Sequence, residues 1–221
     1  MHIARILLIA LVLTLTACGG GDEEPESAPT TTEPAPTVGG CAAVNVPEPK
    51  PDGGQEAPKD PLDTDKTYRL VVATNCGVLT ITLDQAKAPK TAASLVALAQ
   101  NGFYDGTTFH RVVPGFVIQG GDPTGTGAGG PGYKTVDAPP QTAAYTSGVV
   151  AMAKTGTEPA GTSGSQFFVV TGADIGLPPD YAIVGSVTDG MDAVSAIEEL
   201  GVGDGPPSQP VVIEKVTVQE S

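Results

Sequence analysis

Two polar side chains in the segment FHRVVPGFVIQGGD, residues 109–122, have types and spacing suited to binding a peptide. Arg111 and Gln119 are separated by an even number of residues. They therefore share one face if the segment is a single strand without a bulge. A guanidinium and an amide would then lie together above aliphatic and aromatic neighbours, where both can hydrogen-bond to a polypeptide backbone.

A second segment, GSQFFVV at residues 164–170, has the same character. Gln166 and Phe168 alternate along it, so a strand places both on one face. Together the two segments predict a surface that holds an extended peptide. The pattern alone leaves another interpretation open, in which Phe116 and Phe168 are only core residues and Arg111 is a surface ion-pair partner.

The other motifs in the sequence are less consistent with a catalytic or ligand-binding role. Residues 125–130 fit GxGxxG, but Pro and Gly follow where a dinucleotide fold needs a helix N-terminus. Residues 161–165 lack the last Gly of a hydrolase elbow. His110 lies in an apolar stretch and is interpreted as a hydrogen-bonded structural residue. With no CxxC motif and no Cys/His cluster, no metal site is expected.

The segments FHRVVPGFVIQGGD, GTGAGGPGY, AMAKTG and GSQFFV, in this order and spacing, resemble those of the cyclophilins. The resemblance covers roughly residues 67–218. It implies a mainly β fold, a closed eight-stranded antiparallel barrel capped by two α-helices. It also implies peptidyl-prolyl cis/trans isomerase activity without a cofactor, acting on Pro-containing polypeptides.

The resemblance assigns roles to individual residues of this chain. It makes Arg111 the catalytic residue, with Gln119 orienting its guanidinium. The residues that it implies for substrate binding are Phe116, Val117, Gly127, Ala153, Lys154, Thr155, Gln166, Phe168, Leu177 and Tyr181.

Three of these positions, and the neighbouring Gly176, depart from the family pattern. Val117 stands where Met is frequent, and Lys154 stands in a segment commonly written Ala-Asn-Ala. Gly176 replaces the pocket Trp of many eukaryotic members, and Tyr181 replaces the pocket His. These changes bear on cyclosporin affinity and substrate preference more than on catalysis.

The elements that must position these residues are short. Runs rich in β-branched residues predict seven or eight strands, at residues 68–74, 77–83, 112–119, 149–154, 167–171, 182–187 and 211–218. Helical spacing of apolar residues predicts helices at residues 91–101 and 191–200, with Gly102 and Gly201 as their stops.

The N-terminal residues 1–17 are predicted to be a signal peptide, because a basic start precedes an apolar stretch. Its end, LTAC, resembles the lipobox of bacterial lipoproteins, which makes Cys18 the lipidated mature N-terminus. We therefore expect a lipid-anchored protein on the extracytoplasmic face of the bacterial cell membrane. The alternative is ordinary secretion, with Cys18 left as a spare thiol.

Residues 18–66 are rich in Pro, Gly and acidic residues and predict a disordered tether to the isomerase domain, residues 67–221. A small apolar island around Cys41 interrupts this tract. In an oxidising compartment Cys41 and Cys76 are the two thiols that remain once Cys18 is lipidated, so they are expected to pair. Two free, half-buried thiols are the alternative.

The formal net charge of −14 argues against nucleic acid as a partner, because a phosphate backbone needs clustered Lys and Arg. We expect a monomer that accelerates X-Pro rotation in exported proteins. A catalytically weak peptide-binding or chaperone module at the membrane surface is the alternative function.

Overall fold

The structure, a computed structural model, describes residues 37–38 and 40–221. Its main feature is a nine-stranded antiparallel sheet. In pairing order the strands are β5 (Thr107–Thr108), β13 (Val212–Glu220), β3 (Tyr68–Thr74), β4 (Gly77–Leu83), β12 (Ile183–Asp189), β9 (Val149–Met152), β11 (Phe167–Val170), β7 (Val117–Gly120) and β6 (Arg111–Val113). Two small sheets pair β1 (Thr37–Val38) with β2 (Cys41–Ala42), and β8 (Thr135–Val136) with β10 (Thr162–Ser163).

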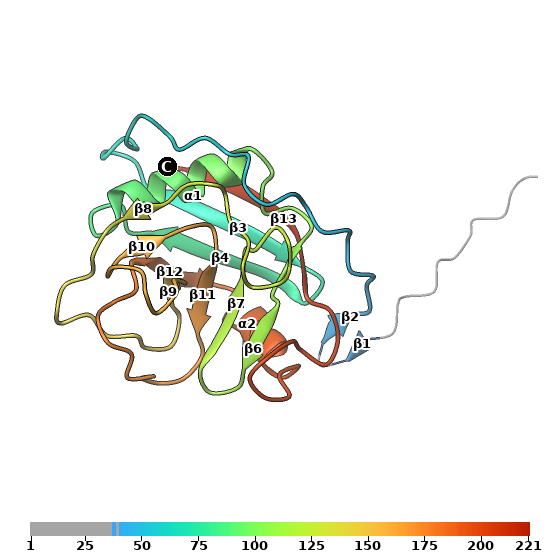
Figure 1. The fold of residues 1–221 in the computed structure, drawn as a ribbon. Coiled ribbons are helices and arrows are strands. Elements are labelled where there is room, and N and C mark those ends of the chain that lie inside the picture. The colour runs from blue at the N-terminus through green and yellow to red at the C-terminus, as the bar shows by residue number, and fades with distance from the viewer. Residues whose placement is uncertain (1–36, 39) are drawn as a thin grey trace, which may run out of the picture. The chain divides into compact units, whose positions relative to one another are not determined.

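The sheet is curled but open (Figure 1). An isolated bridge between Thr108 and Asp122 brings β5 beside the end of β7. In the described part of the chain, however, no pairing joins β5 to β6. The expected closed eight-stranded barrel is therefore not what the structure shows, because a two-residue end strand is too short to form a continuous ladder with the other end of the sheet.

The segment predicted as one strand at residues 112–119 is a hairpin. Strands β6 and β7 pair with each other, and Pro114 and Gly115 lie in the turn between them. Proline cannot donate to a ladder and presets the dihedral angle of a turn, while Gly115 has a φ of 71° that favours glycine. These two residues therefore divide one apolar run into two strands.

Helices α1 (Pro89–Gln100) and α2 (Met191–Glu198) lie at opposite ends of the curled sheet (Figure 1). Helix α1 begins with a proline at its first position, where the missing N–H has no partner to lose. The faces predicted from helical spacing are buried, including Ala92, Leu95, Val194 and Ile197. Helix α1 packs on β3 and β13, and α2 packs on β4, β6 and β7.

Strand alternation divides the buried residues into two clusters. The larger cluster fills the inside of the curl and includes Phe167 of β11. The smaller one lies on the other face of β7, β9 and β11 and contains Val117, Ala151 and Phe168. Adjacent residues of one strand thus serve different cores, because successive side chains point to opposite faces.

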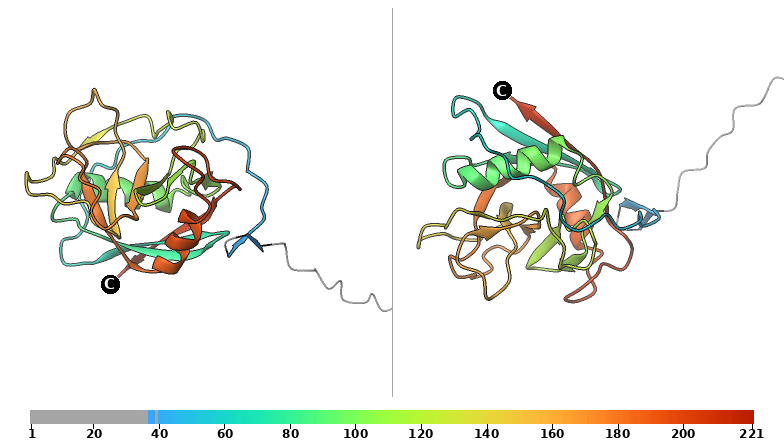
Figure 2. Two further views of the ribbon diagram at one scale, coloured as in Figure 1. Left: turned by 90° about the horizontal axis from the view of Figure 1, so that it is seen from below. Right: turned by 45° about the horizontal axis from the view of Figure 1, so that its top comes forward.

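Residues 40–66, which we call the strap, are not the disordered tether that the composition predicts. The strap runs along the outside of the domain (Figure 2) and belongs to the same compact unit as the sheet. Its backbone bonds to the domain at Ala42, Lys50, Gly53 and Gln55, and Leu62 packs against the core. A Pro-rich segment that cannot form its own core can still be ordered by hydrogen bonds to a folded neighbour.

A disulfide joins Cys41 of the strap to Cys76 in the turn between β3 and β4, with an S–S distance of 2.05 Å. Asn75 supports the junction, since its side-chain nitrogen donates to the carbonyl oxygens of Ala42 and Pro210. Of the two alternatives left open by the sequence, the structure has the paired cysteines.

The predicted signal peptide at residues 1–17 and the predicted lipidation site Cys18 lie outside the described residues. Within the described part, none of the helices has the length and apolar character needed to cross a membrane.

The disulfide makes the first testable prediction. Replacing both cysteines, Cys41→Ser with Cys76→Ser, should lower the free energy of unfolding by about 2–4 kcal/mol, because the unfolded chain loses a cross-link. Urea unfolding followed by circular dichroism measures this loss. Treating the wild type with a reductant should give the same shift, and an unchanged midpoint in the double variant would contradict the prediction.

Candidate active site

Nine residues from several strands and loops surround one pocket of about 270 Å³, which we call the aromatic pocket. They are Arg111, Phe116, Val117, Gln119, Ala153, Lys154, Phe168, Leu177 and Tyr181. All nine were predicted as site residues. The pocket sits on the smaller buried cluster, so its floor is held by packed side chains rather than by a mobile loop.

The pair at the edge of this pocket is set by strand register. Arg111 of β6 lies directly opposite Gln119 of β7 in the antiparallel ladder. Its Nη1 donates to the side-chain Oε1 of Gln119 at 3.3 Å. The two residues are close because they face each other across a hairpin, and not, as the spacing argument assumed, because they share the face of one strand.

Asp204 is a site residue that the sequence did not reveal. It lies in the loop between α2 and β13 and holds Arg111 in a bidentate ion pair, with Nε donating to Oδ1 at 2.6 Å and Nη2 donating to Oδ2 at 3.0 Å. This hydrogen bond from Arg111 holds the pKa of Asp204 below its usual range. An exposed aspartate in a glycine-rich loop carries no spacing signal that could have identified it.

Arg111 also lies over an aromatic ring, with its central carbon 5.7 Å from the ring centroid of Phe116. The contact keeps the plane of the guanidinium beside the apolar wall. Because Asp204 engages Nε and Nη2 while Gln119 engages Nη1, the guanidinium is fixed from two sides. Each terminal nitrogen still carries a second N–H that can donate to a ligand.

Gln166 continues the polar chain away from Arg111. Its Oε1 accepts from the Nε2 of Gln119 at 3.0 Å, and its own Nε2 donates to the carbonyl oxygens of Gly127 and Gly129 at 3.0 and 2.9 Å. This pattern fixes the orientation of both amides, because each nitrogen has an oxygen acceptor.

The carbonyls of Gly127 and Gly129 belong to the glycine-rich loop of residues 123–131, which we call the glycine loop. The loop forms one wall of a second cavity of about 260 Å³, the glycine-loop pocket. This cavity shares Gln119, Ala153 and Lys154 with the aromatic pocket, so the two are adjacent. The remaining predicted residues, Gly127, Thr155 and Gln166, line the second pocket.

Asp122 secures the glycine loop from within. Its buried carboxylate accepts hydrogen bonds from the N–H and hydroxyl of Thr124 and from the N–H of Gly127. Burial alone would raise the pKa of Asp122, but these donors outweigh it and hold the pKa below its ordinary value. The loop conformation therefore depends on the ionised form of this side chain.

Lys154, which departs from the family pattern, lies where both pockets meet. Its Nζ donates to the carbonyl oxygens of Thr155 and Glu158 and stands 5.4 Å from the ring centroid of Tyr181. The N–H groups of Ala153 and Thr155 donate within the protein, to Gln166 and Glu158. Two of the three N–H groups of this segment are therefore engaged within the protein.

The interpretation of His110 as a hydrogen-bonded structural residue is supported only in part. Both ring nitrogens are buried without a hydrogen bond of good geometry among the described residues, and the backbone of Thr108 is the one group close enough to act on the imidazole as an acceptor. Burial lowers the pKa of the imidazole, so the neutral form is favoured.

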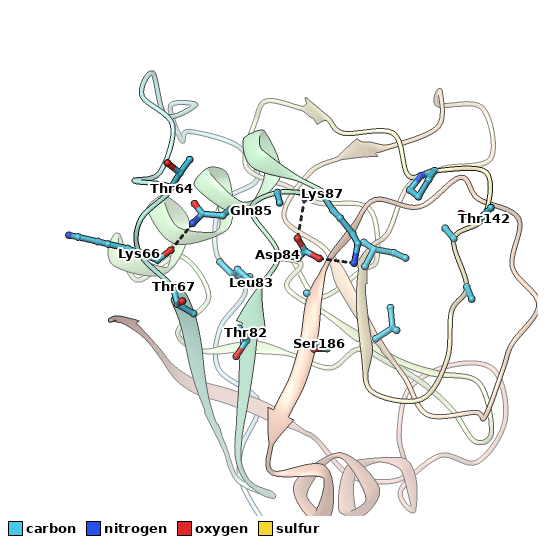
Figure 3. A pocket seen from close by; sticks show the side chains of 17 residues that line it. Thr64, Lys66, Thr67, Thr82, Leu83, Asp84, Gln85, Lys87, Thr142 and Ser186 are labelled. Atoms are coloured by element: carbon cyan, nitrogen blue, oxygen red, sulfur yellow. Dashed lines mark hydrogen bonds and ion pairs between the residues drawn. The ribbon is translucent and has the colours of Figure 1, made fainter.

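A cavity of about 770 Å³ lies apart from the predicted site (Figure 3). It is lined by polar and apolar residues near the ends of β4 and β12, where Asp84 pairs with Lys87 and Gln85 donates to the Lys66 carbonyl oxygen. The polar side chains of Asp84, Lys87 and Gln85 are thus engaged within the protein. Within residues 37–38 and 40–221, no cluster of His, Cys, Asp and Glu could hold a metal ion.

Fold and site together define a class: a mainly β protein with two adjacent pockets on an antiparallel sheet, one of them lined by aromatic side chains and an arginine. The comparisons with known proteins narrow this class. A family model described as cyclophilin type peptidyl-prolyl cis-trans isomerase/CLD matches residues 69–218. The chain therefore belongs to the cyclophilin-type peptidyl-prolyl cis-trans isomerases, a family of enzymes.

Individual relatives agree with this assignment. The chain is 43% identical over 171 residues to peptidyl-prolyl cis-trans isomerase A of Mycobacterium tuberculosis, covering 69% of this chain and 92% of the relative. A Cryptosporidium parvum cyclophilin type isomerase, crystallised in the presence of the dipeptide Ala-Pro, superposes with a TM-score of 0.63 and 32% identity. That match covers 68% of this chain and 98% of the other.

The Asp122 carboxylate predicts a pH dependence. Because its pKa is lower in the folded chain than the value of about 3.9 of an unfolded chain, its contribution to stability is complete above about pH 5. That contribution is lost as the pH falls through the folded pKa. Urea unfolding between about pH 3 and pH 7 measures this effect.

The matched variant is Asp122→Asn, which should be destabilised by about 1–3 kcal/mol at neutral pH, since an amide cannot accept from all three donors. It should also lose less stability on acidification than the wild type. Asp60→Asn, an exposed carboxyl on the strap, is the control. Equal acid sensitivity of wild type and Asp122→Asn would show that another group is responsible.

Proposed function

We propose that this chain accelerates rotation about X-Pro bonds in exported polypeptides, with Arg111 as the catalytic residue and the aromatic pocket as the proline site. Rotation is slow because amide resonance must be lost, at a barrier of about 18–20 kcal/mol. No bond is made or broken, so the catalyst only has to bind the twisted amide better than either planar form.

The arrangement of Arg111 beside an apolar pocket is the observation that carries this proposal. As the amide twists, the prolyl nitrogen becomes pyramidal and regains a lone pair, to which a guanidinium N–H can donate. The adjacent carbonyl oxygen is the other acceptor within reach of the same group. Because Asp204 and Gln119 hold the guanidinium in place, little reorganisation is needed in the transition state.

The apolar walls supply the other half of the mechanism. Phe116, Phe168 and Leu177 can clamp a pyrrolidine ring, which is compact and lacks an N–H to satisfy. The adjacent glycine-loop pocket then receives a neighbouring side chain of the peptide. Holding one side of the X-Pro bond in a pocket lets the other side rotate against it.

Replacement of the catalytic residue tests the mechanism. Arg111→Ala should lower kcat/KM for a short Xaa-Pro peptide by about tenfold or more, a loss on the order of 1.4 kcal/mol in transition-state binding. NMR exchange spectroscopy on the full-length chain measures the rate without a coupling enzyme.

Arg69→Ala is the matched control, because Arg69 lies on β3 and bonds to Ser221 rather than to the site. It should leave the rate unchanged. Near-normal exchange rates with Arg111→Ala would remove this residue from the catalytic role.

The location of the protein is part of the proposal. Lipidation of Cys18 after removal of residues 1–17 would anchor the domain to the extracytoplasmic face of the membrane. The sequence pattern supports this, and so does the disulfide, because structural disulfides persist in oxidising compartments. Mass spectrometry of the membrane fraction should find a diacylglyceryl group on Cys18, and none on Cys18→Ala.

A catalytically weak peptide-binding module is a second candidate, favoured by the bidentate engagement of Arg111 by Asp204. If this ion pair suppresses catalysis, wild type should bind a Pro-containing peptide without accelerating its exchange, and Asp204→Ala should increase the exchange rate. If Asp204 only orients the guanidinium, as we propose, Asp204→Ala should slow exchange.

A further inference from the structure

We infer that the strap is a positioning element for the glycine-loop pocket, with Asp52 as its positioning residue. By holding the glycine loop, the strap sets the affinity for substrate residues that flank the proline. This inference rests on the proposed isomerase function and extends it. The strap precedes residues 69–218 matched by the family model, so it is an addition to the domain that the family shares.

Backbone hydrogen bonds join the strap to both ends of the glycine loop. At the start of the loop, the N–H of Lys50 donates to the carbonyl oxygen of Pro123 at 2.8 Å. At its end, the N–H of Gly53 donates to Gly130 at 2.9 Å and the N–H of Gln55 donates to Pro131 at 3.0 Å. Backbone bonds at both ends fix where the loop begins and where it returns.

Asp52 adds a side-chain hydrogen bond between strap and loop. Its Oδ1 accepts from the N–H of Gly130 at 2.8 Å. With Gly130 also accepting from Gly53, both backbone groups of this loop residue are satisfied by the strap.

Close backbone packing sets the register between strap and loop. A Cβ on Gly132 would lie 3.1 Å from the Cα of Gly53, and both residues have positive φ values, 94° and 76°. Side chains at either position would therefore push the segments apart or strain the backbone. Glycine at these two positions lets the strap lie close to the backbone just after the loop.

The loop needs this support because its backbone is rich in glycine. Glycines lose more conformational freedom on folding than any other residue, and they make up most of residues 125–130. Asp122 holds the loop from inside, and the strap holds it from outside. Without the outer contacts, Gly129 and Gly130 would lose a restraint next to the pocket wall.

A continuous hydrogen-bonded path then leads from the strap to the catalytic centre. Gly129, next to the residue held by Asp52, accepts from Gln166, and Gln166 accepts from Gln119. Gln119 in turn accepts from Arg111. The strap contact acts first on the pocket wall at Gly129, and Arg111 lies three hydrogen bonds further along this path. The strap therefore acts on substrate affinity more than on the chemical step.

The strap itself is anchored on either side of Asp52. The disulfide between Cys41 and Cys76 holds one end, and Leu62 packs against the core at the other. Between them, the Nζ of Lys50 donates to the carbonyl oxygens of Gly102 and Phe103 at 3.0 and 2.9 Å, at the end of α1. The segment that meets the loop is therefore braced against the rigid part of the fold.

The test compares two peptides on the full-length chain. One is a short Xaa-Pro peptide that fills only the aromatic pocket, and the other is longer and also reaches the glycine-loop pocket. Asp52→Ala should raise both Kd and KM for the longer peptide by about three- to tenfold, since one hydrogen bond to the loop is lost, with kcat changed less than about twofold. Values for the short peptide should stay as in the wild type.

Two matched variants separate positioning from general damage. Asp52→Asn keeps an Oδ1 acceptor for the Gly130 N–H and should retain wild-type affinity for the longer peptide. Asp60→Ala removes another exposed strap carboxyl, outside the junction with the loop, and should also behave as wild type.

An Asp52→Ala variant with unchanged Kd for the longer peptide would overturn the inference, and so would equal losses for both peptides. Kd is measured by NMR titration, which does not require catalysis. A wild type that binds but does not accelerate exchange would count against the proposed function, while the Kd comparison would still decide the role of the strap.

Discussion

The cross-strand register of β6 with β7 places Arg111 opposite Gln119, and the rest of the site depends on it. A slip of β6 by one residue would turn Arg111 to the other face of the sheet, away from Gln119. Gln119 itself is placed by the register of β7 with β11, which lets it reach Gln166, the residue that bonds to the glycine loop. The hairpin turn at Pro114 and Gly115 fixes the register of β6 with β7, so a short local element sets the geometry of a site assembled from distant parts of the chain.

The sheet supports the site by dividing its side chains between two faces. Phe167 points into the main core, where it packs edge-on against Tyr104, whereas Phe168 points to the pocket and packs edge-on against Tyr181. The pocket floor is thus continuous with a strand that is buried on both faces. Rigid support of this kind limits the reorganisation required when a peptide binds, which suits the proposed mechanism of binding a twisted amide.

The two charged side chains that line the aromatic pocket are both cationic. The chain is strongly acidic, yet Arg111 and Lys154 both line the aromatic pocket. Asp204 pairs with Arg111, while the Nζ of Lys154 donates to carbonyl oxygens and lies over the Tyr181 ring. Glu158 and Lys134 form a further ion pair at the wall of the adjacent glycine-loop pocket.

The sequence by itself determined the periodic elements and the residue types of the site. Strand alternation and helical spacing located most strands and both helices, and the resemblance to the cyclophilins assigned all twelve candidate residues that line the two pockets. Only the tertiary structure decided that Arg111 and Gln119 face each other across a hairpin, that Asp204 joins them, and that the sheet stays open. It also showed that the strap is ordered, because its order comes from hydrogen bonds to Pro123, Gly130 and Pro131 and not from its own composition. Contacts between residues far apart in the chain leave no periodic trace, so patterns of spacing cannot reveal them.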